Sequence, residues 1–310
     1  MPSELRSRIV EAADAVRARL RAGDKRAAPG DTRAGGAQLP SIAVILGTGL
    51  GDFAQALTST VVVPYADIPH FPRSTVESHA GELHVGTLSG RRVAVMKGRV
   101  HYYEGYSMQQ VAFPVRVLRE LGCHTLIVTN AGGGMNPDMP AGTIVVTTDH
   151  INLMGDNPLI GPNDDSLGPR FPDMSEPYSR DLIALAEQAA LDLKQPLQRG
   201  VFVGVPGPNL ETAAEYRFLR AAGADVVGMS LVPETIVAVH GGMRVLAFNV
   251  VTDACLPDAL HPVDLAAVLE VAGRTAPALT RLVTEIVRRL DASNSDSNPA
   301  ARSTHAPAVK

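Results

Sequence analysis

Lys97-Gly-Arg-Val-His-Tyr-Tyr-Glu-Gly-Tyr106 opens the stretch that decides the fold, and Leu126-Ile-Val-Thr-Asn-Ala-Gly-Gly-Gly-Met-Asn136 closes it. Arg99 carries a permanent positive charge and a planar fork of donors that suits an oxyanion. His101 and Tyr103 follow at intervals of two, so in an extended segment all three side chains point to one face. The second half is a buried strand running into glycines, which let the backbone aim N–H groups at a ligand. A surface Arg–His pair and an ordinary glycine turn would explain each half alone, but together they predict an anion site.

Apolar runs that end in glycine-rich or polar turns alternate with segments of helical periodicity along the rest of the chain. The predicted strands cover residues 42–46, 83–88, 92–97, 125–129, 142–148, 200–205, 224–227 and 244–251. The predicted helices cover residues 3–20, 108–121, 180–193, 212–222, 232–240 and 262–290, with Pro277 as the place for a kink. This alternation indicates an α/β fold with its site at the strand ends.

Residues 41–290 form one predicted domain, because no repeat or second-domain boundary divides them. Residues 1–40 contain the first helix and then a flexible connection from 21 to 40, and residues 291–310 have the composition of a disordered tail. Residues 149–178 are dense in Pro, Gly, Asn and Asp, and a loop of this length in a compact domain is usually functional.

The chain of 310 residues is 45% hydrophobic and 19% charged, which is typical of a soluble globular protein. Its net charge of −4 without a Lys/Arg-rich run argues against a nucleic-acid partner, and its apolar runs are too short to span a membrane. Cys123 and Cys255 are too few for a disulfide framework, and no ligand cluster has metal-binding spacing, so we expect no metal. The N-terminus lacks an apolar core, so we expect no secretion signal and a cytoplasmic protein.

Four strand-end motifs supply the donors that a phosphate dianion needs, namely Thr48, Arg99, His101, the amides near Ala131, and Ser230. Gly47-Thr-Gly-Leu-Gly51 taken alone is at least as well explained as a tight turn, because it lacks Walker residues and the third spacing of G-x-G-x-x-G. Ser230 could instead be a nucleophile or a helix N-cap, although the elbow pattern G-x-S-x-G is missing. His79 lies in a polar loop.

A second group of side chains follows the later predicted strands: Glu211, Met229, Thr252 and Asp253. Glu211 has a simpler interpretation as an acid at a helix start, stabilised by the helix dipole. Asp253 comes directly after an apolar strand, where carboxylates often belong to sites. His261 precedes a proline near the last helix, where a capping or solvent-facing histidine is the simpler interpretation.

These residues in this order resemble the trimeric class of purine nucleoside phosphorylases. The resemblance runs from about Ile42 to Ile286 and rests on LGTGLG, FPRSTVESHAG, GRVHYYEGY, VTNAGGGMNP, DHINL, NPLIGPND, RFPDMS, GPNLETAAEYR and GADVVGMSLVPE. It implies a single α/β domain with a central mixed β-sheet flanked by helices. It also implies reversible phosphorolysis of purine (deoxy)ribonucleosides to free base and (deoxy)ribose 1-phosphate in purine salvage. Phosphate would be a co-substrate, and no cofactor would be needed.

The resemblance implies a role for each matching residue. Phosphate would be held by Thr48, Arg99, His101, Ala131 and Ser230, with His79 beside it. The catalytic set would be Arg99, His101, Glu104, which braces His101, and Asp253. The nucleoside would contact Tyr103, Leu210, Glu211, Val227, Met229, Thr252, Asp253 and His261. Within that set Glu211 would pair with purine N1–H and His261 with the 5′-hydroxyl. Phe171 would enter the neighbouring subunit's site in a homotrimer.

Two positions depart from the family pattern. Thr48 stands where the family more often has Ser. Asp253 stands where 6-oxopurine phosphorylases usually have Asn, and an ionised carboxylate only accepts hydrogen bonds, which favours a 6-amino group. Aspartate there resembles methylthioadenosine phosphorylases, but these carry a second Asp where this chain has Cys255, and they lack the 5′-hydroxyl histidine. The loop from Asp253 to His261 is shorter than usual, which weakens the assignment of His261.

Three hypotheses follow for the function. The leading one is phosphorolysis of purine nucleosides, and the alternative is a phosphorylase that prefers 6-aminopurines or 5′-methylthioadenosine. A protonated Asp253 could donate like an amide and so keep 6-oxopurines as substrates. A non-catalytic nucleoside or dinucleotide sensor is suggested only by the glycines after the first strand, and their spacing disfavours it.

Overall fold

The computed structural model describes residues 3–24, 38–75 and 80–290. The predicted site residue His79, residues 25–37 of the predicted connection and the predicted tail lie outside these ranges. The strands are β1 Ile42–Ile45, β2 Thr58–Pro64, β3 Glu82–Leu88, β4 Arg91–Lys97, β5 Thr125–Gly134, β6 Ile144–Asn152, β7 Gln198–Gly204, β8 Val226–Gly228 and β9 Arg244–Ala254. The α-helices are α1 Glu4–Asp24, α2 Met108–Glu120, α3 Arg180–Asp192, α4 Ala213–Ala221, α5 Val232–His240 and α6 Leu265–Arg289. Short 3₁₀ helices are η1 Gly51–Ala56, η2 Tyr65–Asp67 and η3 Tyr102–Glu104.

Within the described residues, the strands form one mixed sheet in the order β2-β3-β4-β1-β5-β8-β7-β6-β9. Strand β9 also pairs in parallel along β5, so the second half of the sheet closes on itself. β1 runs parallel to both β4 and β5, whereas β3 and β4 form an antiparallel hairpin through Ser89 and Gly90. Both turn residues have positive φ, as this kind of two-residue turn requires. The predicted mixed α/β sheet is confirmed.

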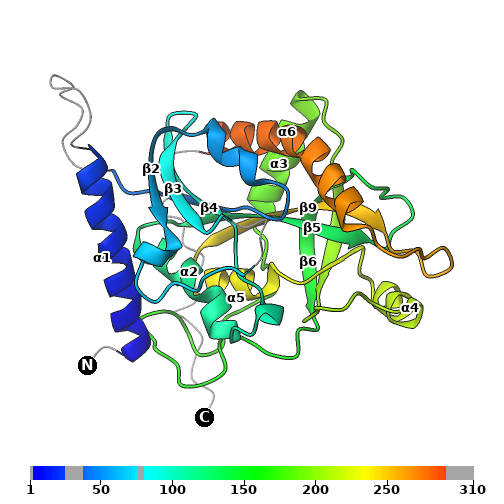
Figure 1. The fold of residues 1–310 in the computed structure, drawn as a ribbon, viewed down its shortest axis with the longest axis horizontal. Coiled ribbons are helices and arrows are strands. Elements are labelled where there is room, and N and C mark those ends of the chain that lie inside the picture. Colours follow the sequence, from blue (N-terminus) through cyan, green and yellow to red (C-terminus); the bar gives the residue numbers. More distant parts are fainter. Residues whose placement is uncertain (1–2, 25–37, 76–79, 291–310) are drawn as a thin grey trace, which may run out of the picture.

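Helices cover the sheet on two sides (Figure 1). α3 and α6 pack against each other on one side, and α1, α2 and α5 lie on the other. An ion pair of 2.8 Å between Arg289 and Asp192 joins α6 to the end of α3. Another of 2.7 Å between Arg6 and Glu120 joins α1 to α2. Pro114 and Pro277 lie inside continuous helices, so neither ends the helix in which it occurs.

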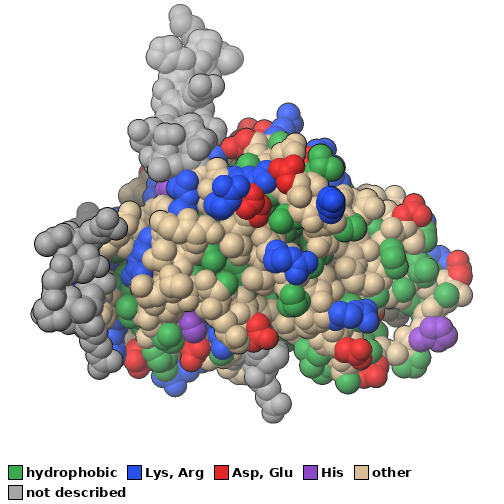
Figure 2. Space-filling model, turned by 90° about the horizontal axis from the view of Figure 1, so that it is seen from above, with side chains coloured by type: hydrophobic (Ala, Val, Ile, Leu, Met, Phe, Trp, Pro, Cys, Tyr) green, Lys and Arg blue, Asp and Glu red, His purple; other side chains and the backbone are tan. Residues whose placement is uncertain are grey.

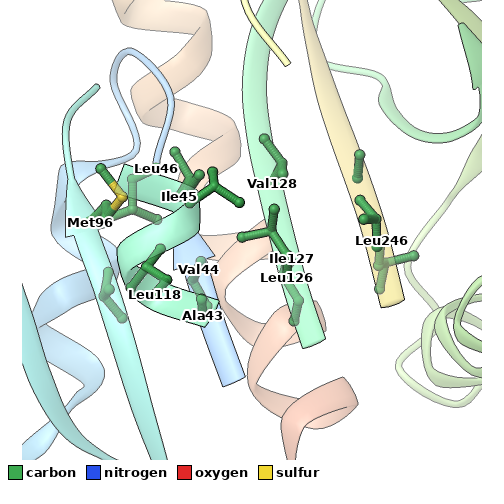
Figure 3. Packing of buried hydrophobic residues seen from close by; sticks show 14 of the residues in the cluster. Ala43, Val44, Ile45, Leu46, Met96, Leu118, Leu126, Ile127, Val128 and Leu246 are labelled. Atoms are coloured by element: carbon green, nitrogen blue, oxygen red, sulfur yellow. The ribbon is translucent and has the colours of Figure 1, made fainter. Parts of the chain in front are cut away.

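The core lies between the central strands and the helices that cover them. All four residues of β1 are buried, and Figure 3 shows Val44, Ile45, Met96, Ile127 and Leu246 lying along neighbouring strands. A strand that is covered on both faces is apolar throughout, without alternation. The uninterrupted apolar runs of the sequence were therefore correct indicators of β1, β4, β5 and β9.

Strand β2 was not predicted from the sequence. It pairs antiparallel with β3 at the edge of the sheet, and most of its residues are exposed or half-exposed. An edge strand of this kind buries few side chains, so Thr58–Pro64 shows no clear hydrophobic period.

The glycines of β5 form a strand, which corrects the prediction of a glycine turn after Thr129. β5 continues to Gly134 because its last residues pair with β8 on one side and with β9 on the other. A Cβ at Gly132 would lie 2.7 Å from the Val227 carbonyl oxygen, and one at Gly134 would lie 2.6 Å from a Val251 methyl. Glycine is needed here for close packing between two neighbouring strands.

The surface carries both signs of charge. Figure 2 shows Lys and Arg interspersed with Asp and Glu on the face that it draws. None of the described helices combines the length and the apolarity needed to cross a bilayer.

Candidate functional site

A cavity of about 390 Å³ opens where β1, β5, β8 and β9 end. The predicted residues that line it are Thr48, His101, Tyr103, Ala131, Leu210, Glu211, Val227, Met229, Ser230, Thr252 and Asp253. They come from segments up to about two hundred residues apart in the chain. The sequence prediction that separate strand ends converge on one pocket agrees with this placement.

The turn after β1 is tied to β5 by a buried threonine. The Thr129 hydroxyl donates to the Ile45 carbonyl and accepts from the Gly47 amide, each at 3.1 Å. Gly47 itself packs against β5, where a Cβ would lie 2.9 Å from the Asn130 Cα. These contacts hold Thr48 at the cavity into which Ala131 also opens.

A chain of buried polar side chains supports the same end of the cavity. Ser230 donates to Asn130 at 2.7 Å, Asn130 donates to Asn249 at 3.1 Å, and Asn249 donates to Thr147 at 2.7 Å. Each donor finds an acceptor, as burial of polar groups requires. Asn130 lines the cavity and was missed as a site residue, although it stands directly before Ala131 in the predicted motif.

His101 is held by Glu104. The carboxylate oxygen Oε1 lies 2.7 Å from the His101 amide nitrogen and 3.1 Å from Nδ1, while Oε2 accepts two bonds of 2.7 Å from Thr75. Burial alone raises the pKa of Glu104, but these hydrogen bonds outweigh it and lower the pKa to about 2. The ring of Tyr103 stacks on His101 at 4.8 Å. The structure shows the predicted contact by which Glu104 braces His101.

Arg99 is not among the residues that line this cavity. Its guanidinium is buried, lies 3.3 Å from a carboxylate oxygen of Glu234, and donates to the Thr129 carbonyl. Burial lowers the pKa of Arg99 and the neighbouring Glu234 raises it. Arg99 therefore contacts β5 at Thr129, one residue before Asn130, which lines the cavity. The structure does not bring it together with Thr48 and Ser230 in one cavity.

The opposite end of the cavity carries carboxylates. Asp253 Oδ1 accepts from the Thr252 hydroxyl at 2.8 Å, and Oδ2 accepts from the Cys255 thiol at 3.2 Å. Glu211 lines the same cavity beside Tyr216. Cys255 and Tyr216 were missed by sequence reasoning. The signal for Cys255 was its position two residues after Asp253, which places both side chains on one face of an extended strand.

The remaining wall of the cavity is apolar. His261 and Phe171, which were predicted as site residues, do not line the cavity. Val263, Leu265 and Val268 line the cavity at the start of α6, whereas the exposed His261 does not. Phe171 lies on a separate surface and its side chain is 86% exposed. His79 lies outside the described residues.

The arrangement suits a ligand with a polar anionic end and a hydrogen-bonding aromatic end. Hydroxyls of Thr48 and Ser230, the imidazole of His101, two carboxylates and apolar side chains all line this one cavity. Among the described residues, no three His, Cys, Asp or Glu side chains gather in a way that could hold a metal ion.

Comparisons with known proteins agree with this architecture. The family described as the Phosphorylase superfamily matches residues 41–288. The chain is 52% identical over 252 residues to purine nucleoside phosphorylase 1 of Bacillus subtilis, covering 81% of this chain and 93% of that protein. It is 50% identical over 226 residues to purine nucleoside phosphorylase of Bos taurus, covering 71% and 78%.

A solved structure of a purine nucleoside phosphorylase is also similar to this chain. The crystal structure of Schistosoma mansoni purine nucleoside phosphorylase in complex with adenosine superposes with a TM-score of 0.78 and 40% identity, covering 82% of this chain and 92% of that one. The cavity described above and these likenesses lead to one conclusion: the chain belongs to the purine nucleoside phosphorylase family of the phosphorylase superfamily.

Proposed function

We propose that this enzyme catalyses the reversible phosphorolysis of purine ribo- and deoxyribonucleosides to a free base and a pentose 1-phosphate, as in purine salvage. One observation carries the proposal: a single cavity joins Thr48, His101, Ala131 and Ser230 at one end to Glu211 and Asp253 at the other. Inorganic phosphate is the co-substrate, and no other cofactor takes part. The cytoplasmic location stays a prediction from the sequence.

The chemistry follows from where charge develops. The C1′–N9 bond breaks with its electron pair going to the purine, a phosphate oxygen forms a new bond to C1′, and the base takes up a proton. Positive charge on the sugar is stabilised by the dianion held beneath it, and negative charge on the base by hydrogen bonds at its edge. Each well-placed donor of this kind is typically worth about 3 kcal/mol of barrier.

Base release from inosine, guanosine and adenosine, measured with and without phosphate, tests the proposal. We expect release to require phosphate and to yield pentose 1-phosphate in equal amount. Base release that is independent of phosphate would identify a hydrolase instead. Tight NAD binding without any base release would identify a sensor.

A preference for 6-aminopurines is a second candidate, favoured by the environment of Asp253. Both oxygens of this carboxylate accept hydrogen bonds from neighbouring side chains, so it offers the ligand acceptors and not donors. Such a group attracts a 6-amino group and repels the O6 of inosine. We expect adenosine to exceed inosine in kcat/KM, and Asp253→Asn to shift the preference towards inosine by about tenfold or more.

The apolar wall at Val263, Leu265 and Val268 supports the related alternative of a 5′-methylthio substrate. These three side chains offer no hydrogen-bonding group to a 5′-hydroxyl, and His261 is exposed and does not line the cavity. Values of kcat/KM for adenosine, 5′-deoxyadenosine and 5′-methylthioadenosine distinguish an apolar 5′ subsite from one that binds a 5′-hydroxyl. Equal or better use of the two 5′-deoxy compounds supports an apolar 5′ subsite, whereas a strong preference for adenosine excludes it.

We further propose a homotrimer in which Phe171 enters the neighbouring subunit's site. The exposure of Phe171, together with 63% exposure of Ile160 beside the same surface cavity, supports burial against a second copy.

A further inference from the structure

Cys255 occupies a fixed place at the base end of the cavity. Its amide donates to the Gly134 carbonyl at 2.8 Å, which anchors it to β5 just beyond the end of β9. Cys255 is 3% exposed, yet it lines the cavity together with Asp253. The thiol is therefore presented to the site from a backbone position that is hydrogen-bonded to β5.

The sulfur lies against Gly133 and Tyr216. A Cβ at Gly133 would lie only 2.4 Å from Sγ, so glycine at that position is what makes room for the thiol. The hydroxyl of Tyr216 lies beside the sulfur as well. Sγ lies 3.2 Å from Asp253 Oδ2, which is hydrogen-bond distance for a thiol donor.

In this hydrogen bond the thiol of Cys255 is the donor and the carboxylate of Asp253 is the acceptor. Burial and the nearby Asp253 raise the pKa of Cys255 to about 12, so sulfur keeps its proton at any physiological pH. The Thr252 hydroxyl approaches the other carboxylate oxygen at 2.8 Å, closer than its 3.2 Å distance to the Gly132 carbonyl. Asp253 thus receives one donor on each oxygen.

We infer that Cys255 is a positioning residue which, with Thr252, orients Asp253 and keeps it a hydrogen-bond acceptor, so that the enzyme favours 6-aminopurines over 6-oxopurines. The inference rests on the proposed function, in which Asp253 faces the purine. Without the thiol, Oδ2 would lose this donor, and the carboxyl group would be less restrained in the orientation that faces the base.

Three single variants test the role of the thiol. Cys255→Ala removes the donor, Cys255→Val removes it while keeping a side chain of similar size, and Cys255→Ser keeps a donor. The readout is the ratio of kcat/KM for adenosine to that for inosine. We expect the ratio to fall about tenfold in Cys255→Ala and Cys255→Val, because hydrogen bonds to charged groups contribute this much, and to stay within about threefold in Cys255→Ser.

A double-variant cycle separates positioning from a purely structural role. In an Asp253→Asn background the carboxylate is gone, so replacing Cys255 by Val should leave the ratio unchanged within about twofold. A ratio that falls equally in both backgrounds would overturn the inference, as would an unchanged ratio in both Cys255→Ala and Cys255→Val. Wild-type enzyme that phosphorolyses neither nucleoside would overturn the proposed function, and the inference with it.

Discussion

His101 illustrates how single side chains are prepared for function. Its position is determined by Glu104, whose two oxygens accept bonds from His101 and Thr75, and by the stacked ring of Tyr103. The Glu104 side chain is 1% exposed, so its carboxylate depends on these donors for solvation. The arrangement fixes the imidazole before any ligand arrives, which is the condition for efficient electrostatic stabilisation.

The lowered pKa of Glu104 predicts a dependence of stability on pH. Because the folded state lowers this pKa from 4.5 to about 2, the stabilisation is complete above about pH 4.5 and is lost as pH falls towards 2. We expect Glu104→Gln to be clearly less stable than wild type at pH 7 and the difference to shrink at pH 3.5. Urea unfolding at both pH values measures this, with Asp14→Asn, whose carboxylate is 63% exposed, as control. A difference that stays constant with pH would contradict the expectation.

Arg99 and Glu234 form a buried pair, and this complicates any test of the predicted phosphate contact. Each side chain is 3% exposed. Arg99→Met alone leaves a buried carboxylate without its cation, and we expect a loss of about 3–5 kcal/mol in unfolding free energy. The double variant with Glu234→Gln should recover most of that stability.

The double variant also separates the two roles of Arg99. If Arg99 reaches phosphate during the reaction, the stable double variant still shows a KM for phosphate raised at least tenfold. Restored stability with a wild-type phosphate KM would restrict Arg99 to its structural contacts with Thr129 and Glu234.

Among the elements, β5 does most to assemble the site. One strand supplies Thr129, which ties down the turn after β1, then Asn130, and then Ala131 to Gly133 in the cavity wall. Its first residues pair with β1, and its last residues, which are glycines, pair with β8 and β9. Close strand approach is therefore part of the site's architecture.

Gly47→Ala should disturb this junction. The new Cβ would lie 2.9 Å from both the Asn130 Cα and the Thr129 carbonyl oxygen, and neither is a flexible atom. We expect a loss of about 1–3 kcal/mol in unfolding free energy and a higher KM for phosphate, because Thr48 moves with its neighbour. Gly51→Ala is the matched control, since its Cβ would meet only the flexible Lys97 side chain at 3.5 Å. Equal effects of the two variants would show that the contact with β5 is unimportant.

At the scale of the whole molecule, the closed half of the sheet gathers residues from distant segments into one cavity, while the long loop after β6 carries Phe171 to another surface. The cavity still has exposed apolar residues at its edge, including Leu210 at 51% and Leu265 at 67%. A neighbouring subunit that covers them would exclude water from the reaction.

Phe171→Ala tests the proposed trimer. Because the ring is exposed within one chain, its loss should leave subunit stability almost unchanged but raise the nucleoside KM about tenfold. Leu191→Ala, on α3 and 71% exposed, is the control and should leave KM unchanged. Light scattering gives the oligomeric state. A fully active monomer, or an unchanged KM in Phe171→Ala, would exclude the shared site.

The sequence by itself determined the α/β alternation, nearly all helices and strands, and most residues of the cavity, because hydrophobic periodicity and strand-end motifs are local properties of the chain. Only the tertiary structure decided that the glycines after Thr129 form a strand, that Arg99 pairs with Glu234, and that Cys255 donates to Asp253. The pairing of β5 with β8 and β9 and the pairing of Arg99 with Glu234 depend on segments about a hundred or more residues apart. The orientation of Cys255 depends on packing against Gly133 of another strand. Contacts of this kind cannot be predicted from the sequence pattern around either residue.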